Sequence, residues 1–454
     1  MASRSAGDAG WAWEAAVGAG GLVDCVRRAC DARELMQLAV AAHPPRSDHA
    51  SVVIGKAAFT MAAAWEPREA GPGRCLLVAP VGAPGEASRR WNVLRGDHPI
   101  PSDRSVAAAG ELRRTTLRIG DGELGENEVL EGEGLVVMLS GGASSLVCEP
   151  PVQVPLEELR ELTRSLMRAG ATIEELNTVR KHLDLTKGGR LIAGIGAYPI
   201  DVYVLSDVLG DDPAVIGSGP FAPDPTTYAD AISVLVDRGC WEHAPAATAY
   251  LEAGAKGLHP ETLKPGDPWF ENVRTHLIGN NDTAVDAAAA WARTNELVVK
   301  LVQWRVQGEA REVGARLARE AAALPAGGAI VLGGETTVKI TGGGHGGRNQ
   351  ELALAAAIEL DLLGAADDVA VVTFGTDGVD GVAPEGRPPA AGALVTSAIV
   401  REARARGLDA AAYLERNDGY GFFASLHAAG VPCHVITGPT GTNVCDVAIA
   451  WHRQ

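Results

Sequence analysis

A glycine-rich stretch followed by an arginine is the clearest chemical signal in this 454-residue chain. Residues 342–347 carry a β-carbon only at His345, so the backbone can adopt positive φ and let a ligand approach closely. Arg348 follows at once, and Asn349 begins a pattern typical of a helix. N–H groups at a helix start favour anions, and a guanidinium suits phosphate or carboxylate. The pattern predicts an anion site built from Gly344, Gly346, Gly347 and Arg348.

Two other loops combine small residues with a strand end. The apolar run 51–54 leads through Gly55 to Lys56, which stands at the start of a predicted helix. The apolar run 135–139 predicts a buried strand and leads into small residues, of which Ser140, Gly141, Gly142 and Ser144 are candidates for a phosphate nest of N–H groups. Ligands of parallel sheets bind beyond the carboxyl ends of strands. An ordinary turn and a surface lysine explain these two patterns about equally well.

Carboxylates follow two further predicted strands. Asp207 comes directly after the apolar run 202–205, and Asp377 and Asp380 come after the run 369–374. Mg²⁺ prefers one or two carboxylates together with waters and phosphates, so Asp207 is the favoured metal ligand. Turns are also rich in Asp for local hydrogen bonding, which is the competing explanation.

The sequence does not decide the roles of three other stretches. Residues 177–190 are among the most basic in the chain and could be either a solvated helix face or an anion-binding surface. His98 beside Asp97 is set aside as an acid–base pair, because adjacent side chains seldom face each other. Residues 437–443 are small and hydroxylated, and they fit a pocket lining or a turn equally well.

The composition limits the partners of the protein. Its net charge of −17 disfavours non-specific binding to nucleic acid or anionic lipid, so an anionic substrate must be held by local cations. The seven cysteines form no C-x-x-C pair, which indicates reduced thiols. No apolar run is long enough for a bilayer, and the first ten residues lack a secretory pattern. We therefore expect a cytoplasmic protein that acts on a small molecule.

Strand and helix patterns alternate along the chain, which predicts an α/β protein with largely parallel sheets. The length favours two domains, with ranges predicted at 1–260 and 270–454. Residues 22–42 predict one amphipathic helix, and the β-branched residues 336–341 predict a strand.

These features together favour phosphoryl transfer, which depends on positioning, Mg²⁺ and cations. The main alternative is a nicotinamide-dependent oxidoreductase. Gly342, Gly344 and Gly347 match G-x-G-x-x-G, and Asp367 lies at about the usual distance for a ribose ligand, although it precedes its strand. A third possibility is a metabolite sensor without turnover.

The order of these motifs resembles the class II glycerate kinases, whose C-terminal part is called the MOFRL region. The resemblance runs through nearly the whole chain and rests on residues 53–58, 96–101, 139–146, 176–183, 206–213, 333–337, 346–351, 375–381 and 438–443. Three departures stand out: Ala143 and Ser144 replace a usual Gly-Ser, Leu209 replaces a usual proline, and the proline-rich segment 382–391 lacks the family's aspartate.

The resemblance implies a Rossmann-like three-layer N-terminal domain, a smaller α/β domain and a cleft between them. It also implies ATP- and Mg²⁺-dependent phosphorylation of D-glycerate to 2-phosphoglycerate, with Lys56 and Arg348 essential. A homodimer is an open expectation, and some family members carry an older hydroxypyruvate reductase label.

Within this frame we assign provisional roles to the candidate residues. Lys56, Arg180 and Arg348 contact the substrate, Asp207 and Glu335 hold Mg²⁺, and Asp377 is the candidate general base.

Overall fold

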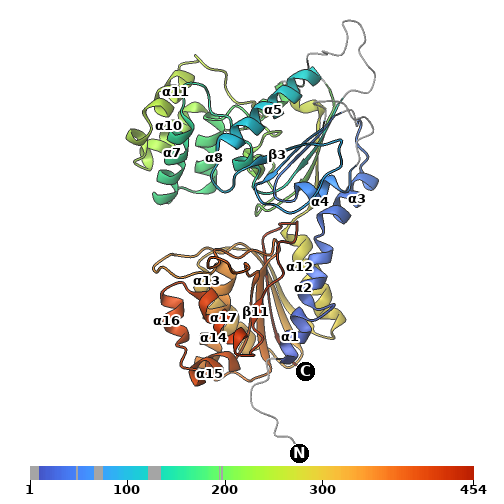
Figure 1. Ribbon diagram of the computed structural model, residues 1–454, viewed down its shortest axis with the longest axis vertical. Coiled ribbons are helices and arrows are strands. Elements are labelled where there is room, and N and C mark those ends of the chain that lie inside the picture. Colours follow the sequence, from blue (N-terminus) through green and yellow to red (C-terminus); the bar gives the residue numbers. More distant parts are fainter. Residues whose placement is uncertain (1–9, 48–49, 66–74, 121–133, 194, 196–197) are drawn as a thin grey trace, which may run out of the picture. The chain divides into compact units, whose positions relative to one another are not determined.

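The computed structural model describes residues 10–47, 50–65, 75–120, 134–193, 195 and 198–454. The chain forms two compact units (Figure 1). The middle unit is Ala32–Ile278, and the terminal unit joins Met1–Asp31 to Gly279–Gln454. The predicted ranges 1–260 and 270–454 differ from this division at the N-terminus. There Trp11 packs edge-on against Trp451, with ring centroids 5.9 Å apart, a long-range contact that no local pattern reveals.

The middle unit is built on a six-stranded sheet with the order β3-β2-β1-β4-β5-β6. Its strands are β1 (Ala50–Ile54), β2 (Cys75–Pro80), β3 (Asn92–Gly96), β4 (Leu135–Leu139), β5 (Ile200–Leu205) and β6 (Val273–Gly279). The pairs from β3 to β5 are parallel. The strand order reverses direction between β1 and β4, which makes that position the switch point of the sheet.

Helices cover both faces of this sheet, as a Rossmann-like three-layer fold requires (Figure 1). Alternate strand residues such as Val52 and Val137 pack on one face against Leu112 and Leu191. The helices concerned are α3 (Ala32–Ala42), α4 (Ala58–Ala62), α5 (Asp103–Gly120), α6 (Ala143–Leu146) and α9 (Arg190–Ala193).

A helical group with its own core adjoins this sheet within the middle unit. It consists of α7 (Leu156–Arg168), α8 (Ile173–His182), α10 (Tyr228–Asp237) and α11 (Pro245–Ala255). Short 3₁₀ turns lie in three of the connections: η1 (Ile216–Ser218) between β5 and α10, η2 (Trp241–His243) between α10 and α11, and η3 (Pro268–Asn272) between α11 and β6.

The terminal unit contains a second six-stranded sheet with the order β11-β10-β9-β12-β8-β7. Its strands are β7 (Val298–Val306), β8 (Gly328–Gly334), β9 (Val369–Gly375), β10 (Gly392–Thr396), β11 (His434–Val435) and β12 (Asp446–His452). The last strand, β12, lies between β8 and β9 and is antiparallel to both. This sheet is therefore mixed, although β7, β8, β9 and β11 share one direction.

Helices lie on both sides of the second sheet as well (Figure 1). α2 packs on α12 on one side, whereas α13 and α14 pack together on the other. The helices are α1 (Gly10–Val17), α2 (Leu22–Ala29), α12 (Asn281–Thr294), α13 (Ala310–Ala322), α14 (Arg348–Leu362), α15 (Ala398–Ala405), α16 (Ala410–Glu415) and α17 (Gly419–Ala428). Among the described residues, no helix combines the length and apolarity that crossing a bilayer requires.

Two local predictions were wrong. The helix predicted over 22–42 is two helices, α2 and α3, because the chain leaves helical geometry at Cys30 and the division between the two units falls after Asp31. The strand predicted over 336–341 forms only an isolated bridge between Glu309 and Thr337. No described strand pairs with residues 338–341, and Ile340 is 80% exposed.

Candidate active site

The switch point of the middle unit brings Lys56 and the serine loop, defined as Ser140–Ser145, together. The Lys56 N–H donates to the Gly141 carbonyl oxygen at 2.9 Å, and the Ala57 N–H donates to Ser140 Oγ at 3.1 Å. Gly55 has φ of +139°, and a β-carbon there would lie 2.1 Å from Ser140 Oγ. Glycine is thus required where the two strand ends meet, and the contact fixes the lysine against the loop.

The serine loop presents unused backbone donors at this point. Ser140 N–H donates to the Ile54 carbonyl, and Ser145 N–H donates back to Gly142. The N–H groups of residues 141–144 donate to no acceptor within the described part of the chain. Successive unpaired N–H groups form an anion-binding concavity.

Asp207 and His98 complete this cluster. A β-carbon on Gly141 would lie 1.8 Å from Asp207 Oδ2, so the carboxylate rests directly against the loop. A β-carbon on Gly142 would lie 2.9 Å from His98 Cδ2 and 3.3 Å from Lys56 Cγ. Desolvation of the imidazole and the nearby Lys56 charge lower the pKa of His98, which favours its neutral form. Sequence reasoning set His98 aside because it considered only the neighbour Asp97.

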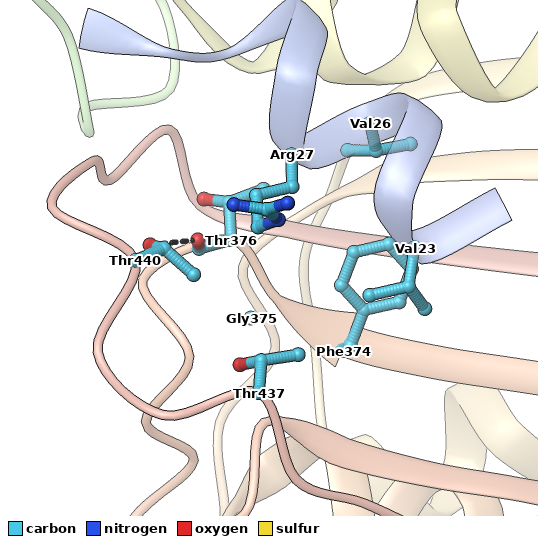
Figure 2. A pocket seen from close by; sticks show the side chains of 8 residues that line it. All are labelled: Val23, Val26, Arg27, Phe374, Gly375, Thr376, Thr437 and Thr440. Atoms are coloured by element: carbon cyan, nitrogen blue, oxygen red, sulfur yellow. Dashed lines mark hydrogen bonds between the residues drawn. The ribbon is translucent and has the colours of Figure 1, made fainter. Parts of the chain in front are cut away.

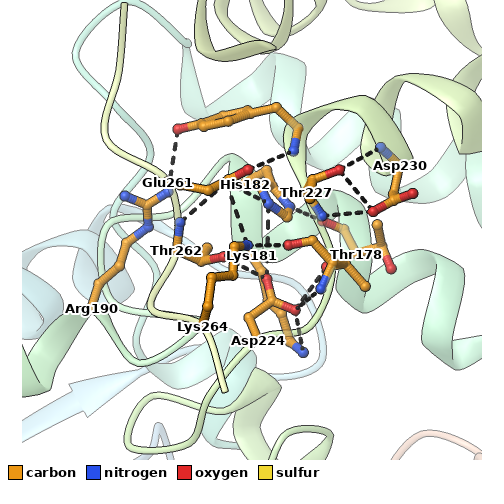
Figure 3. A network of polar contacts seen from close by, with 12 residues as sticks. Thr178, Lys181, His182, Arg190, Asp224, Thr227, Asp230, Glu261, Thr262 and Lys264 are labelled. Atoms are coloured by element: carbon orange, nitrogen blue, oxygen red, sulfur yellow. Dashed lines mark hydrogen bonds and ion pairs between the residues drawn. The ribbon is translucent and has the colours of Figure 1, made fainter. Parts of the chain in front are cut away.

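The basic stretch 177–190 divides into two kinds of residue. Lys181 and Lys187 are buried in ion pairs, Lys181 with Asp224 at 3.2 Å and Lys187 with Asp184. His182 lies 3.0 Å from Glu261 in the same network as Lys181 (Figure 3). These side chains are structural, and the interpretation as a solvated helix face is wrong for them because they are buried. Arg180 is half-buried, and burial lowers its pKa.

In the terminal unit, Arg348 is held by two carboxylates. Its Nη2 lies 3.2 Å from Asp446 Oδ1, its Nε contacts the other Asp446 oxygen, and its Nη1 lies 2.8 Å from Glu335 Oε1. Burial opposes the charged form, but the Asp446 and Glu335 carboxylates outweigh it and raise the pKa of Arg348. The guanidinium is therefore always charged and has a fixed orientation.

The N–H groups at the start of α14 bind a carboxylate of the protein itself, that of Asp380. The carboxylate of Asp380 accepts hydrogen bonds from the N–H groups of Asn349, at 3.0 Å, and Gln350, at 2.8 Å. Asp380 is 5% exposed, and burial raises its pKa to about 6. We expected these N–H groups to point at a ligand in the glycine loop, and that expectation was wrong because Asp380 occupies them.

The glycine loop 342–347 also has most of its donors engaged. The N–H groups of Gly342, Gly344 and Gly346 donate to Asn417 Oδ1, the Arg416 carbonyl and the Val382 carbonyl, each at 2.9 Å. A β-carbon on Gly344 would lie 2.5 Å from the Asp418 side chain, and one on Gly347 would lie 2.4 Å from Asp380. Close packing thus accounts for these glycines, and phosphate binding by Gly344, Gly346 and Gly347 stays a prediction.

Other carboxylates lie beside Arg348 at the same edge of the sheet. Asp446 pairs in register with Gly334 and Gly375, at the ends of β8 and β9. A β-carbon on Gly375 would lie 3.3 Å from Asp377 Oδ1 and 3.4 Å from Asp446 Oδ1. Asp377 Oδ1 accepts the Val379 N–H, as an Asx turn does. Sequence reasoning missed Asp446, whose only local signal is a carboxylate at the start of an apolar strand.

The loop 437–443 lines a small pocket together with the end of β9 (Figure 2). Thr437 and Thr440 face Gly375 and Thr376, and α2 contributes Val23, Val26 and Arg27. Thr440 Oγ1 donates to the Thr376 carbonyl oxygen. Of this loop, Thr437 and Thr440 border the pocket, and both hydroxyls donate to backbone carbonyl oxygens, so the choice between a pocket lining and a turn stays open.

The geometry argues against the dinucleotide-binding alternative. β8 ends at Gly334, several residues before Gly342, so the G-x-G-x-x-G match does not follow a strand directly. Asp367, the predicted ribose ligand, pairs with Arg401 and accepts a hydrogen bond from Ser397 at 2.8 Å. Both observations remove the structural context that the motif requires.

Comparison with known proteins agrees with the observed architecture. Residues 8–252 match a family described as a domain of unknown function, DUF4147, and residues 328–446 match the MOFRL family. The D-glycerate 2-kinase of Thermotoga maritima is 36% identical over 406 residues, covering 88% of this chain and 89% of that protein. The chain belongs to the glycerate kinase family. This membership confirms the resemblance drawn from the motifs.

A solved structure and a second relative extend the comparison of this family member. A crystal structure of glycerate kinase from Thermotoga maritima aligns with a TM-score of 0.76 at 34% identity, covering 95% of this chain and 98% of that one. A protein of Agrobacterium vitis named putative hydroxypyruvate reductase is 35% identical, covering 89% of this chain and 87% of that protein. The α/β fold with a MOFRL region is thus shared with a solved glycerate kinase.

Proposed function

We propose that this protein transfers the γ-phosphoryl group of ATP to D-glycerate, with Mg²⁺, to give 2-phosphoglycerate. The observation that carries the proposal is the set of unused N–H groups at residues 141–144, beside Lys56 at the switch point of a parallel sheet. Phosphoryl transfer needs fixed cations and donors rather than a covalent nucleophile. Family membership supports glycerate as the phosphoryl acceptor.

The serine loop would hold phosphate oxygens, and Lys56 would balance their charge. A cation about 4 Å from a phosphoryl oxygen contributes roughly 4 kcal/mol at an effective dielectric near 20, which is about three decades in rate. Arg348, fixed by Asp446 and Glu335, supplies a second oriented cation in the proposal. That Lys56 and Arg348 act on one substrate stays a prediction, because they belong to different units.

The residues present fit Mg²⁺ in a limited way. Within the described ranges, no group of three or more His, Cys, Asp or Glu side chains could hold a metal. Asp207 rests against Gly141 where any side chain would clash, so one carboxylate lies beside the proposed phosphate nest. Bound there, Mg²⁺ would neutralise phosphate charge, with most of its other ligands from phosphate and water. Glu335 as a second ligand and Asp377 as the base stay predictions.

A single assay tests the reaction. Purified protein is incubated with D-glycerate, ATP and MgCl₂, and the product is identified by phosphorus NMR. We expect the resonance of 2-phosphoglycerate and its loss on chelation with EDTA. A 3-phosphoglycerate resonance would contradict the regiochemistry alone, whereas unchanged ATP would contradict the kinase proposal.

The same preparation serves as its own control against the alternatives. Hydroxypyruvate with NADH or NADPH should give no change in absorbance at 340 nm above the blank. Oxidation of the cofactor would favour the reductase, and calorimetric binding of D-glycerate without turnover in either assay would favour the sensor.

A further inference from the structure

Helix α8 carries two unused hydrogen-bond donors on one face. Asn177 is 4% exposed, its Oδ1 accepts a hydrogen bond from the Ser218 hydroxyl at 2.9 Å, and its buried Nδ2 has no hydrogen-bond partner among the described residues. Arg180 is half-buried, and its guanidinium makes no hydrogen bond or ion pair with any residue that the structure describes. Residues three apart lie side by side on a helix, so the two donors are neighbours.

The other basic residues of this stretch all have partners. Lys181 pairs with Asp224, Lys187 pairs with Asp184, and Arg190 donates to the Pro260 carbonyl and the Tyr228 hydroxyl. Asp184 is close to Arg180, but its oxygens are taken by Thr186 and Lys187. Each of these three basic side chains has at least one partner, although Arg190 Nε is buried without one among the described residues. Arg180 differs because none of its guanidinium nitrogens has a described partner.

This face of α8 is connected to the serine loop through the turn η1. Ser218, the last residue of η1, donates to Asn177. A β-carbon on Gly217 would lie 3.2 Å from Ala143 Cβ, inside the serine loop. One short turn therefore contacts both α8 and the proposed phosphate nest.

A buried amide donor without a partner lowers the stability of the folded protein by about 1–3 kcal/mol, and a half-buried cation without a partner lowers it further. A protein that merely needed stability would place apolar side chains at such positions. A guanidinium and an amide N–H₂ group donate hydrogen bonds and accept none through these nitrogens, so a partner must supply acceptor oxygens.

We propose that Asn177 and Arg180 form an oxyanion-binding subsite next to the serine loop, which takes a carboxylate or phosphate group of a substrate. The choice of D-glycerate and ATP as probes rests on the proposed function. The oxygens of the ligand accept hydrogen bonds from the Arg180 fork and from Asn177 Nδ2. The Ser218 hydroxyl holds the amide in that orientation.

Calorimetric titration of the full-length protein with D-glycerate, and separately with a non-hydrolysable ATP analogue, tests the subsite. The variants are Arg180→Gln, Arg180→Lys and Asn177→Asp. Arg164→Gln on α7 is the matched control, because Arg164 is a helical arginine that pairs with Glu157 and Glu161. We expect Arg180→Gln to raise the Kd of one of the two ligands 10- to 100-fold, with Arg180→Lys intermediate and the control unchanged.

The ligand whose affinity falls identifies the source of the oxyanion, glycerate carboxylate or nucleotide phosphate. Thermal unfolding without ligand supplies the second readout. Arg180→Gln should leave Tm unchanged or higher, because it removes a half-buried charge without a partner. Asn177→Asp keeps the acceptor for Ser218 and places a carboxylate beside Arg180, so it should weaken binding while Tm does not fall.

Two results would overturn the proposal: Kd values within twofold of wild type for both ligands in the Arg180→Gln variant, or a lowered Tm that marks Arg180 as structural. Binding is measured without turnover, so failure of the proposed function remains distinguishable. A protein that transfers no phosphoryl group but loses anion affinity on Arg180→Gln would keep the subsite and lose the kinase assignment.

Discussion

The serine loop of the middle unit and the glycine loop of the terminal unit look alike in sequence but differ in what their N–H groups do. At residues 141–144 the N–H groups have no acceptor among the residues described. In the loop 342–347, Gly342, Gly344 and Gly346 donate to the protein itself, and Asp380 occupies the adjoining helix start. Small residues at a strand end therefore permit an anion site, and the remaining chain decides whether it is open.

The difference also separates the two cations. Lys56 stands beside open donors, whereas Arg348 is surrounded by carboxylates. In the proposed function the middle unit receives phosphate, and the terminal unit supplies one cation, Arg348, whose orientation is fixed by Asp446 and Glu335. Substitutions at the two cations and in the two loops should therefore lower activity to different degrees.

Replacing the lysine should cause the largest loss. We expect Lys56→Met to lower kcat about 1000-fold, because a cation next to a transferring phosphoryl group contributes roughly 4 kcal/mol. Steady-state kinetics with D-glycerate and ATP measure it. Lys256→Met is the control, since Lys256 is an exposed lysine of the same unit that pairs with Glu252. A loss below tenfold would place Lys56 outside the site.

A pair of glycine substitutions compares the two loops directly. In Gly141→Ala the new β-carbon would lie 1.8 Å from Asp207 Oδ2, so the loop or the carboxylate must move. We expect kcat/KM to fall about 100-fold, as for a displaced catalytic group. Gly343→Ala meets nothing within 4 Å and should change kcat/KM less than threefold. Equal effects of the two substitutions would remove the contrast between the loops.

Removing a carboxylate that orients Arg348 should lower kcat less than replacing Lys56 does. Asp446→Asn removes the carboxylate that binds two nitrogens of the Arg348 guanidinium, while Glu335 still pairs with the third. We expect kcat to fall about 10- to 50-fold, as the guanidinium keeps its charge but loses its orientation. Asp367→Asn, which affects the more exposed pair with Arg401, is the control. An effect on Tm with unchanged kinetics would make Asp446 purely structural.

The Asp380 carboxylate, which accepts hydrogen bonds from the first N–H groups of α14, should affect the stability of the protein rather than its turnover. Burial raises the pKa of Asp380 to about 6 from 3.8, so between these values the folded protein holds a proton that the unfolded chain releases. This contribution is complete below pH 3.8 and is lost as the pH rises through 6, by up to about 3 kcal/mol.

Urea unfolding of wild type and Asp380→Asn at pH 4, 5, 6 and 7 checks the sign. The free energy of unfolding of wild type relative to the variant should fall across this range. The variant also loses an acceptor for α14 at every pH, which shifts its curve without changing the slope. Parallel curves would mean that Asp380 titrates normally.

Much of the fold could be predicted because local patterns agree with it. The apolar run 135–139 forms β4, and the run 369–374 falls within β9. The first sequence is fully apolar, the second has Thr373 as its one polar residue, and both strands are buried. The predictions failed where a local preference lacked a distant partner. Residues 336–341 are β-branched except at Lys339, but among the described residues they form only an isolated bridge. Residues 22–42 include the division between the two units.

The candidate site divides in the same way. Lys56, Asp207 and the serine loop could be found because glycine, charge and strand ends are visible in the chain itself. Asp446 could not be found, because β12 reaches β8 and β9 only through antiparallel pairing across more than seventy residues. The importance of Arg180 lies in the partner that it lacks, and sequence alone does not show which charges are paired.

The sequence by itself determined the α/β class, the family and the presence of cations and small residues at strand ends. Only the tertiary structure decided which N–H groups remain open, which cations are paired and which carboxylates face them. The physical reason is range: strand and helix preferences act over a few residues, whereas hydrogen bonds and ion pairs between segments depend on where the folded chain places their partners.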